Sequence, residues 1–231
     1  DALAAGLVPQ YIVVHDAALD QATEGEQLRQ ALSTVACDVI RAPAELINDL
    51  SDTTTPQGVL AVLQQVDLPL PPAPSFVLVC DAVNDPGNLG TLLRSAAGAG
   101  VELALLSPGC SDPWGLKVLR AGMGAQFRLP IRQLTWQESS EQLNAWGCAA
   151  YAADAGGELV YDDVDWAVPS ALVVGSEAHG LSDIVRADST VKRCSIPLGG
   201  REGMESLNAA VAGSVILFEA QRQRRQQLKR D

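Results

Sequence analysis

From residue 76 onward, short apolar runs are separated by segments of mixed polarity, and this pattern predicts alternating strands and helices. The apolar runs predict strands at residues 76–81, 101–107, 148–154, 171–176 and 194–198. The segments between them predict helices at residues 89–99, 114–122 and 138–146, with a short one at 181–186. Continuous apolar strands with helices between them are typical of an α/β fold in which helices cover both faces of a parallel sheet.

The first part of the chain shows the same alternation on a smaller scale, which predicts a small α/β unit. Its pattern predicts strands at residues 10–16, 37–43 and 57–65, and helices at residues 24–36 and 44–52. The segment LPLPPAPS, residues 68–75, holds four prolines in eight residues, which favours an extended, semi-rigid linker. We therefore predict two domains, residues 1–67 and residues 76–231, joined by this linker.

A long helix is predicted at the end of the chain, over residues 206–229. Its first half places apolar residues at helical spacing, which indicates a buried face, and Gly213 permits a close backbone approach. Its last part, RQRRQQLKR, carries five basic residues. Two interpretations of this tail stay open: charges that complement the carboxyl end of the helix, or a contact with phosphate.

The net charge of −12 argues against nucleic acid as a partner, because phosphate binding normally uses clustered lysine and arginine. The charge is unevenly distributed, however. Residues 1–75 hold two basic and ten acidic residues, a net charge of −8, whereas residues 76–231 hold fourteen basic and eighteen acidic residues, a net charge of −4. We expect a polyanion to approach the second part of the chain more easily than the first.

The five cysteines are widely spaced and include no C-x-x-C pair, which argues against both a disulfide framework and a zinc site. Cys80 and Cys194 lie in apolar runs, where we expect each thiol to be a buried small hydrophobic group rather than a nucleophile. No apolar run approaches the roughly 18 residues that a membrane span needs. The sequence therefore predicts neither a metal site nor a membrane partner.

A glycine-rich turn follows the strand predicted at 76–81, in the stretch DAVNDPGNLGTLLRSAAGAG. Its glycines match neither the G-x-G-x-x-G pattern of dinucleotide-binding folds nor a P-loop, which argues against a Rossmann oxidoreductase. Asn88 is followed six residues later by Arg94, within a helix of otherwise small and apolar residues. Because an unpaired buried charge is costly, we expect Arg94 to meet an anion or to extend into a cleft.

Ligands of parallel sheets bind beyond the carboxyl ends of the strands, so the loops after Cys80, Leu106, Val174 and Ile196 are candidate binding loops. In ALVVGSEAHGLS, residues 171–182, a buried strand leads into a turn that carries Glu177. In CSIPLGGREGMESLN, residues 194–208, a strand leads into a glycine-rich loop and then into Ser206, Leu207 and Asn208. Three such loops, each with a glycine and a few polar groups, are expected to converge on one ligand pocket.

These segments resemble the three sequence motifs of the SpoU (TrmH-type) RNA ribose 2′-O-methyltransferases of the SPOUT superfamily. The matching pieces are N-x-G-x-x-x-R at 88–94, V-V-G-S-E at 173–177 and I-P-L…S-L-N at 196–208, in the family's order and spacing. The resemblance implies a parallel-sheet SPOUT fold with a C-terminal trefoil knot, S-adenosyl-L-methionine as cofactor, and a homodimer. Residues 1–67 resemble the L30e-like domain that binds substrate RNA in many members, here expected to be truncated at its N-terminus.

The resemblance also implies roles for individual residues. Arg94 would bind a substrate phosphate and polarise the ribose hydroxyl, and the acceptor of the proton stays open. Asn88 and Asn208 would hold the ribose and Arg94 in register, Glu177 would fix the loop or the arginine, and Ser206 would position the substrate. The cofactor would be bound, largely through backbone groups, by five residues: Val174, Gly175, Ile196, Leu198 and Leu207.

Simpler interpretations of the same side chains stay open. Asn88 and Ser206 are both residue types that cap helices, and Glu177 is able to pair with a neighbouring arginine. We expect His179 to be an ordinary loop residue and His15 to be structural or at the surface.

Two features depart from the family pattern. The loop 199–205, GGREGME, is longer than is common in the family and brings in Arg201, and the first domain is acidic where a basic patch is expected. We expect a methyltransferase that acts on structured RNA, with rRNA favoured over tRNA; a non-catalytic RNA-binding or ribosome-assembly homologue is the alternative. The expected location is the cytoplasm for a bacterial protein, and the chloroplast or mitochondrion for a eukaryotic one, because a targeting segment would precede Asp1.

Overall fold

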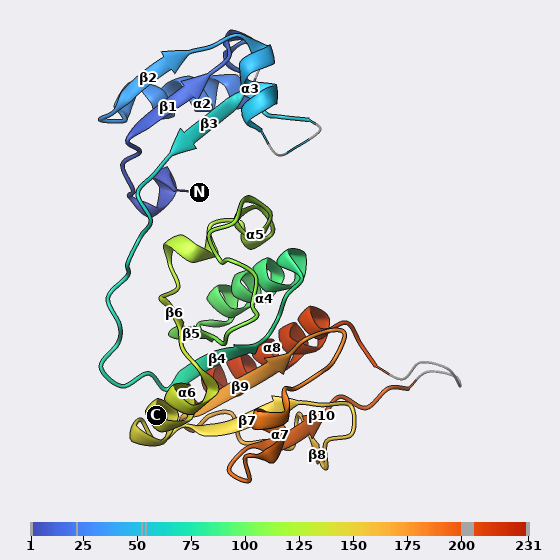
Figure 1. Cartoon of the computed structure of the whole chain (residues 1–231). Helices are drawn as coiled ribbons and strands as arrows, with labels where there is room; N and C mark the ends of the chain where they lie inside the picture. Colours follow the sequence, from blue (N-terminus) through green and yellow to red (C-terminus); the bar gives the residue numbers. More distant parts are fainter. Residues whose placement is uncertain (1, 22, 52, 54, 200–205, 230–231) are drawn as a thin grey trace. The chain divides into compact units, whose positions relative to one another are not determined.

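The computed structural model describes residues 2–21, 23–51, 53, 55–199 and 206–229. The chain divides into two compact units, Asp1–Val66 and Asp67–Asp231 (Figure 1). The boundary lies directly before the proline-rich segment 68–75. That the first unit is an L30e-like domain stays a prediction.

The first unit contains a three-stranded mixed sheet in the order β2-β1-β3. Strand β1 pairs with β2 in parallel and with β3 in antiparallel orientation. Each of the five elements predicted for this unit forms, although the strands are shorter than predicted. The elements are η1 (Leu3–Ala5), β1 (Tyr11–Val14), α1 (Asp16–Leu19), α2 (Thr23–Thr34), β2 (Asp38–Arg41), α3 (Ala44–Leu50) and β3 (Val59–Val62). His15 has a structural role here, because its Nδ1 accepts the Ala17 N–H at 3.2 Å and caps α1.

The second unit is built on a seven-stranded sheet, and its strand order is β6-β5-β4-β9-β7-β10-β8. Every pair of neighbouring strands in this sheet is parallel, which confirms the predicted parallel α/β fold. The strands are β4 (Phe76–Asp81), β5 (Leu103–Leu106), β6 (Ile131–Gln133), β7 (Ala149–Ala153), β8 (Leu159–Val160), β9 (Ser170–Gly175) and β10 (Lys192–Ser195). Strands β6 and β8 were not predicted, because two or three residues of mixed polarity carry no periodic signal.

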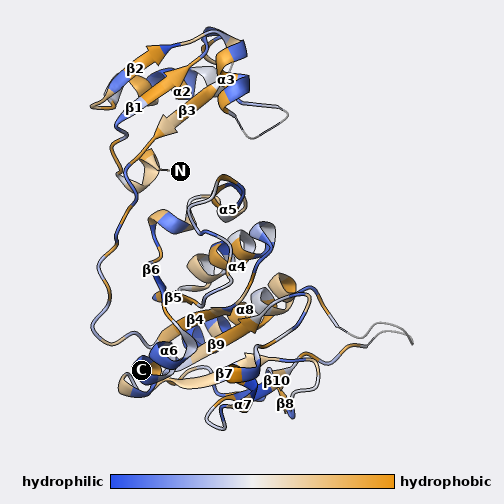
Figure 2. Cartoon of the chain, viewed as in Figure 1, coloured by the Kyte–Doolittle hydropathy of each residue, from blue (hydrophilic) through white to orange (hydrophobic). Residues whose placement is uncertain are grey.

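Helices cover both faces of this sheet, and a separate apolar core lies under each layer. One core joins alternate residues of β4 to α4 (Pro86–Ala99), α5 (Leu116–Gly122) and α8 (Ala209–Gln227). The other joins the remaining residues of β4 to α6 (Trp136–Ala145) and α7 (Asp183–Ala187). A short 3-10 helix, η2 (Ala125–Phe127), follows α5. Figure 2 shows β4 and β9 as apolar along their length, as expected for strands buried on both faces.

The start of α4 differs from the simpler interpretation of Asn88. Asp85 is the N-cap: its side chain accepts the Asn88 N–H at 2.8 Å, and Pro86 occupies the first turn. Asn88 therefore does not cap the helix, and its side chain is available for other contacts.

Helix α4 packs closely against α5 because residue 90 is a glycine. A Cβ built at Gly90 would lie 2.5 Å from the Ala121 Cβ and 2.6 Å from the Val118 carbonyl oxygen. The glycine of the N-x-G-x-x-x-R motif is therefore needed for helix packing. It brings α5 directly against the amino-terminal half of α4.

The chain crosses back over the sheet between β10 and α8. Strand β10 lies beyond β7, whereas α8 packs against α4 and β9 on the other side of β7. The longer loop 199–205, with Arg201, falls between β10 and α8 in the sequence, and apart from Gly199 it is outside the described residues. The trefoil knot therefore stays a prediction.

The packing at Gly90 gives a testable contrast within one helix. We expect Gly90→Ala to lower the free energy of unfolding by about 1–3 kcal/mol, because the added methyl group meets backbone atoms of α5. Gly98→Ala is the matched control: its Cβ would lie 3.6 Å from the Phe218 ring, an ordinary contact, so helix propensity should make it neutral or slightly stabilising. Chemical denaturation of the two variants checks this; equal effects would contradict it.

Candidate functional site

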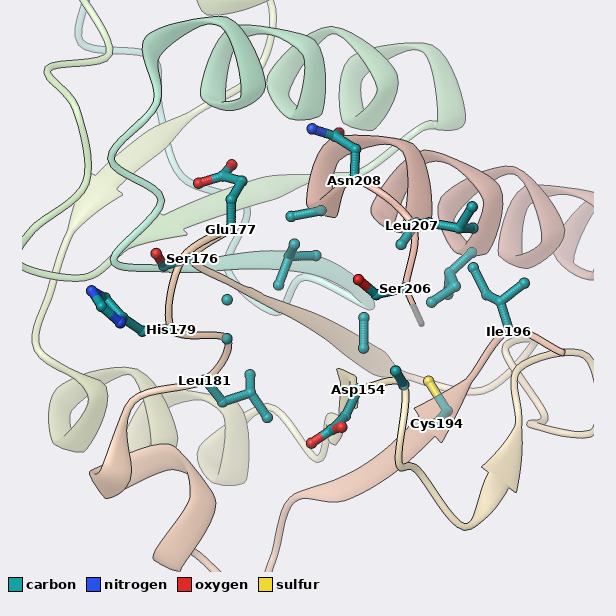
Figure 3. Close-up of a pocket in the computed structure, with 18 of the residues that line it drawn as sticks. Asp154, Ser176, Glu177, His179, Leu181, Cys194, Ile196, Ser206, Leu207 and Asn208 are labelled. Carbon is teal, nitrogen blue, oxygen red and sulfur yellow. The ribbon is translucent and has the colours of Figure 1, made fainter. Parts of the chain in front are cut away.

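A cavity of about 480 Å³ lies at the carboxyl ends of β9, β7 and β10 and beside the start of α8. We call it the central pocket. All five residues expected to bind the cofactor line it, as do Glu177, Ser206 and Asn208. Figure 3 labels Ile196, Leu207, Glu177, Ser206 and Asn208 among them. Its described lining is Ala153, Asp154, Ala155, Val174, Gly175, Ser176, Glu177, His179, Gly180, Leu181, Arg186, Cys194, Ile196, Leu198, Ser206, Leu207, Asn208, Ala209, Ala212 and Ile216.

The strand order explains which loops form this pocket. The loops after Val174 and Ile196 line it as predicted, and the segment 153–155 after β7 lines it as well, which was not predicted. Neither the loop after Cys80 nor the loop after Leu106 lines it, so those two parts of the prediction were wrong. Strand β5 is separated from β9 by β4, so its carboxyl end opens on a different cavity.

The turn after β9 is held in a compact shape by its own backbone. The Ser176 N–H donates to the Gly180 carbonyl at 2.9 Å, and the Gly180 N–H donates back to the Ser176 carbonyl at 2.8 Å. A Cβ on Gly175 would lie 2.4 Å from the Gly180 carbonyl carbon, so only glycine fits where the turn folds back. The pocket wall here is backbone, which suits recognition by N–H and C=O groups.

Asp81 anchors this turn to the neighbouring strand, and sequence reasoning missed it. It is buried, with 3% of its surface exposed, at the end of β4, and it pairs in register with Gly175. One carboxylate oxygen accepts the Ser182 N–H at 2.7 Å, and the other accepts the Ser107 hydroxyl at 3.3 Å. The signal available in the sequence was a carboxylate ending an otherwise apolar strand.

Arg186 supports the same turn from the other side. Its Nε donates to the Leu181 carbonyl at 2.9 Å, and its Nη2 donates to the His179 carbonyl at 3.3 Å. The loop that carries Glu177 is therefore held at its far end by two charged side chains.

Asn88 and Asn208 meet across 120 positions of sequence. The Asn208 side-chain amide donates to Oδ1 of Asn88 at 3.1 Å, and Oδ1 of Asn208 accepts the Val211 N–H at 3.1 Å, which caps α8. The first and third motifs are thus in direct contact. Asn208, not Ser206, is the helix cap, so the capping interpretation of Ser206 is wrong.

Glu177 and His179 both lie on the exposed part of the turn after β9, at the pocket (Figure 3). Among the described residues, none donates a hydrogen bond to the Glu177 carboxylate or pairs with it as an ion pair. The interpretation that Glu177 merely pairs with a neighbouring arginine therefore has no support in these contacts. The Glu177 carboxylate and the His179 ring have no partner among the described residues, so both can contact a ligand.

Arg94 was expected to be buried, and it is not. It is exposed on α4, does not line the central pocket, and has no ion pair or hydrogen bond with another described residue. The expectation of a costly buried charge was wrong, because residues 89, 92, 93 and 96 form the buried face of α4 and residue 94 lies on the other face.

Asp154 and Cys194 are pocket residues that the sequence did not single out for chemistry. The Asp154 carboxylate is held by the Gly156 N–H at 2.9 Å and lies 3.8 Å from the Arg193 guanidinium. Burial, and then the nearby Asp154, raise the pKa of Cys194 to about 12, and burial raises the pKa of Cys80 well above its usual range. Both thiols are therefore buried apolar groups and poor nucleophiles, as predicted.

The basic end of α8 is partly committed to internal contacts. Arg224 donates to the Ser75 and Val168 carbonyls at 2.7 and 2.8 Å and stacks on the Phe76 ring, and burial lowers its pKa. Arg222 pairs with Glu219 at 2.7 Å. These two arginines stabilise the fold, which leaves Arg225 and Lys229 as the described basic residues of the tail that are exposed and have no ion pair with another described residue.

The pocket combines a backbone-rich wall with two carboxylates, Asp154 and Glu177, and a pair of hydrogen-bonded amides at its edge. Such a site suits a ligand with a positive charge and an aromatic base read by N–H and C=O groups. Across the part of the chain that the structure describes, no three histidine, cysteine, aspartate or glutamate side chains are grouped to hold a metal ion. No helix in the described ranges has the length and apolarity to cross a membrane.

Fold and pocket together define an α/β protein with a ligand site at the carboxyl end of a parallel sheet, and comparison with known proteins is more specific. The family model for the SpoU rRNA Methylase family matches residues 75–218. The chain is 34% identical to the mitochondrial rRNA methyltransferase 3 of Homo sapiens, covering all of this chain and 68% of that protein. The chain belongs to the SpoU rRNA methylase family.

Other relatives and solved structures agree. The mitochondrial rRNA methyltransferase 3 of Mus musculus is 35% identical, over 97% of this chain and 65% of its own length. A 23S rRNA guanosine 2′-O-methyltransferase of Bacillus subtilis is 33% identical, over 73% of this chain and 66% of its own. The chain thus spans about two thirds of these relatives.

Two structural neighbours cover nearly the whole chain. The SpoU methyltransferase AviRb from Streptomyces viridochromogenes superposes with a TM-score of 0.81 at 26% identity, over 98% of this chain and 86% of its own. An AdoMet-bound rRNA methyltransferase from Sinorhizobium meliloti gives 0.78 at 29% identity, over 96% and 83%. These neighbours support the SPOUT-type α/β fold for the chain.

The Asp81 anchor can be tested separately from any activity. We expect Asp81→Ala to lower the free energy of unfolding by about 1–3 kcal/mol, because the Ser182 N–H loses its acceptor. Asp81→Asn keeps an oxygen for that N–H and should lose clearly less. Denaturation, with hydrogen exchange of the Ser182 amide, measures both; an unprotected amide in the wild type would contradict the anchoring role.

Proposed function

We propose that this protein transfers a methyl group from S-adenosyl-L-methionine to a ribose 2′-hydroxyl of structured RNA, with rRNA as the substrate class. The observation that carries the proposal is the central pocket, where residues of the second and third motifs line one cavity and Asn208 contacts Asn88 of the first. The names of the relatives support rRNA over tRNA. They include mitochondrial and bacterial proteins, so we propose an organelle or the bacterial cytoplasm as the location.

The residues present fit the proposed cofactor. The cavity has the volume of a typical small-molecule site, and much of its wall comes from backbone around Gly175 and Gly180. Asp154 and Glu177 put negative charge at the pocket, which favours a ligand whose sulfur is positively charged. When bound, S-adenosylmethionine supplies an electrophilic methyl group on that sulfonium. We propose that Val174, Gly175, Ile196, Leu198 and Leu207 hold it.

The polar residues at the rim are proposed to handle the substrate. Asn88 and Asn208 already support each other and present amide groups that can fix a ribose in line with the methyl group. Glu177 and Ser206 are exposed and able to contact the incoming nucleotide. A ribose hydroxyl is a poor nucleophile, so a cation that binds the adjacent phosphate and polarises the hydroxyl would assist the transfer. We assign that role to Arg94.

Arg94 requires a second copy of the chain for this role. Three apolar side chains of α8, Val211, Val215 and Phe218, are exposed by 49%, 38% and 47% at helical spacing. The Ser95 and Ser214 hydroxyls lie 2.7 Å apart, which places Arg94 beside this stripe. We propose a homodimer that covers the stripe and carries Arg94 to the partner's central pocket.

Replacing Arg94 tests the catalytic assignment cleanly, because the exposed side chain supports no contact within the described protomer. We expect Arg94→Ala to reduce methyl transfer from labelled cofactor to protein-free rRNA by about 100-fold or more, with unchanged cofactor affinity and unfolding free energy. Arg225→Ala is the control and should keep full activity. A wild-type protein that binds cofactor but methylates no RNA would instead support the non-catalytic homologue.

Mixed dimers test whether Arg94 acts across the interface. We would combine inactive Arg94→Ala with Ala212→Phe, which fills the pocket that Ala212 lines. If Arg94 acts in the partner's pocket, random exchange of subunits gives mixed dimers that each have one intact pocket. About a quarter of all pockets should then be active. If Arg94 acts within its own subunit, the mixture stays inactive, which would overturn the shared site.

A further inference from the structure

A basic surface on α5 and η2 stands out in an acidic protein. Residues 103–137 carry four basic side chains and one acidic side chain, in a chain of net charge −12. Arg132 is not part of this surface, because it pairs with Asp67 at 2.7 Å and donates to the Leu68 carbonyl. The remaining three, Lys117, Arg120 and Arg128, are exposed. We call them the α5 basic face.

Most other cations of the second unit have local partners. Arg193 lies near Asp154, Arg222 pairs with Glu219, and Arg224 is held by backbone carbonyls. Lys117, in contrast, has no ion pair or side-chain hydrogen bond with any residue in the described ranges. Arg128 has no ion pair there and donates one hydrogen bond, to the Gly124 carbonyl at 3.3 Å. Lys117 and Arg120 are three positions apart and lie on one side of α5. Arg128 directly follows η2, which packs against α5.

Two exposed apolar side chains accompany these charges. Leu116 is 56% exposed, and Met123, at the C-cap of α5 with φ of +47°, is 52% exposed. Large apolar groups beside exposed cations are suited to a ligand that has both anionic and apolar parts. A nucleic acid strand offers phosphates to the cations and sugar or base faces to the apolar groups.

The α5 basic face lies one helix away from the proposed site. Helix α4 lies between α5 and α8 in Figure 1, and Gly90 allows α5 to pack closely against it. Asn88, whose side chain bonds Asn208 at the central pocket, lies two residues before Gly90, on the side of α4 that faces α8. A strand whose ribose reaches Asn88 can therefore continue over the amino-terminal end of α4 to α5.

We propose that the α5 basic face binds the phosphate backbone of the RNA on one side of the methylated nucleotide. This inference rests on the proposed function and adds to it the surface that supplies the electrostatic attraction. Because the first seventy-five residues have a net charge of −8, attraction to RNA has to come from such a local group of cations.

The test removes two positive charges from this face and compares that variant with one that loses two positive charges elsewhere. Lys117→Gln/Arg128→Gln is the test variant, and Arg225→Gln/Lys229→Gln, at the exposed end of α8, is the control of equal net charge. The RNA probes are transcribed fragments of large-subunit rRNA and a 20-nucleotide oligouridine. Binding is measured from 50 to 250 mM KCl, together with cofactor affinity, thermal stability and steady-state methyl transfer.

For the test variant we expect RNA affinity about tenfold weaker and a salt slope smaller by about 1.4–1.8, the loss of two phosphate contacts. KM for RNA should rise while kcat, cofactor affinity and melting temperature stay unchanged, and the control should differ from wild type by less than twofold. Equal weakening of RNA binding in both variants would attribute the effect to net charge. Unchanged RNA binding in the test variant would show that the α5 basic face does not bind RNA. Either result overturns the inference. A wild-type protein that methylates no RNA would refute the proposed function itself.

Discussion

The placement of α8 depends on one close contact that only a glycine allows. A Cβ at Gly213 would lie 2.5 Å from Cδ2 of Leu92 and 3.1 Å from Cγ2 of Val174, so a larger residue would push the helix away from both α4 and β9. With glycine there, α8 packs into the junction between them, and its N-cap residue, Asn208, contacts Asn88. The contact between the first and third motifs is thus a consequence of helix packing more than of the 3.1 Å hydrogen bond itself.

The charged side chains of the molecule also lie where each has a specific contact or use. Carboxylates lie at the pocket, where they would attract a cationic ligand. Asp81, which is 97% buried, accepts hydrogen bonds from a backbone N–H and a hydroxyl group. Cations that take no part in packing lie outside the pocket, on the surface of α4, of α5 and of the end of α8. An overall negative charge is compatible with an RNA partner because repulsion and attraction act locally, within roughly 10 Å at physiological salt.

Strand composition and strand order differ in how far sequence alone can define them. Apolar runs such as 76–81 and 171–176 specify buried strands through local pattern, and the structure confirms them. Order depends on which strand ends meet after folding, which no local pattern encodes. For this reason the loop after Leu106 was wrongly included in the site and Asp154 was missed. The roles of the residues in the three motifs were assigned only by resemblance to a family.

Arg94 shows the same limit on a smaller scale. Its neighbours in sequence are apolar, which suggested burial, yet the spacing of residues 91, 94 and 98 places it on a face that the protomer leaves open. In water a guanidinium has no desolvation penalty and needs no counter-ion, so the isolated chain tolerates it at no cost. The penalty arises only when a second surface covers it, and there an RNA phosphate would compensate for the lost water. An arginine without a partner among the described residues of the protomer is therefore suited to a role completed by assembly and substrate.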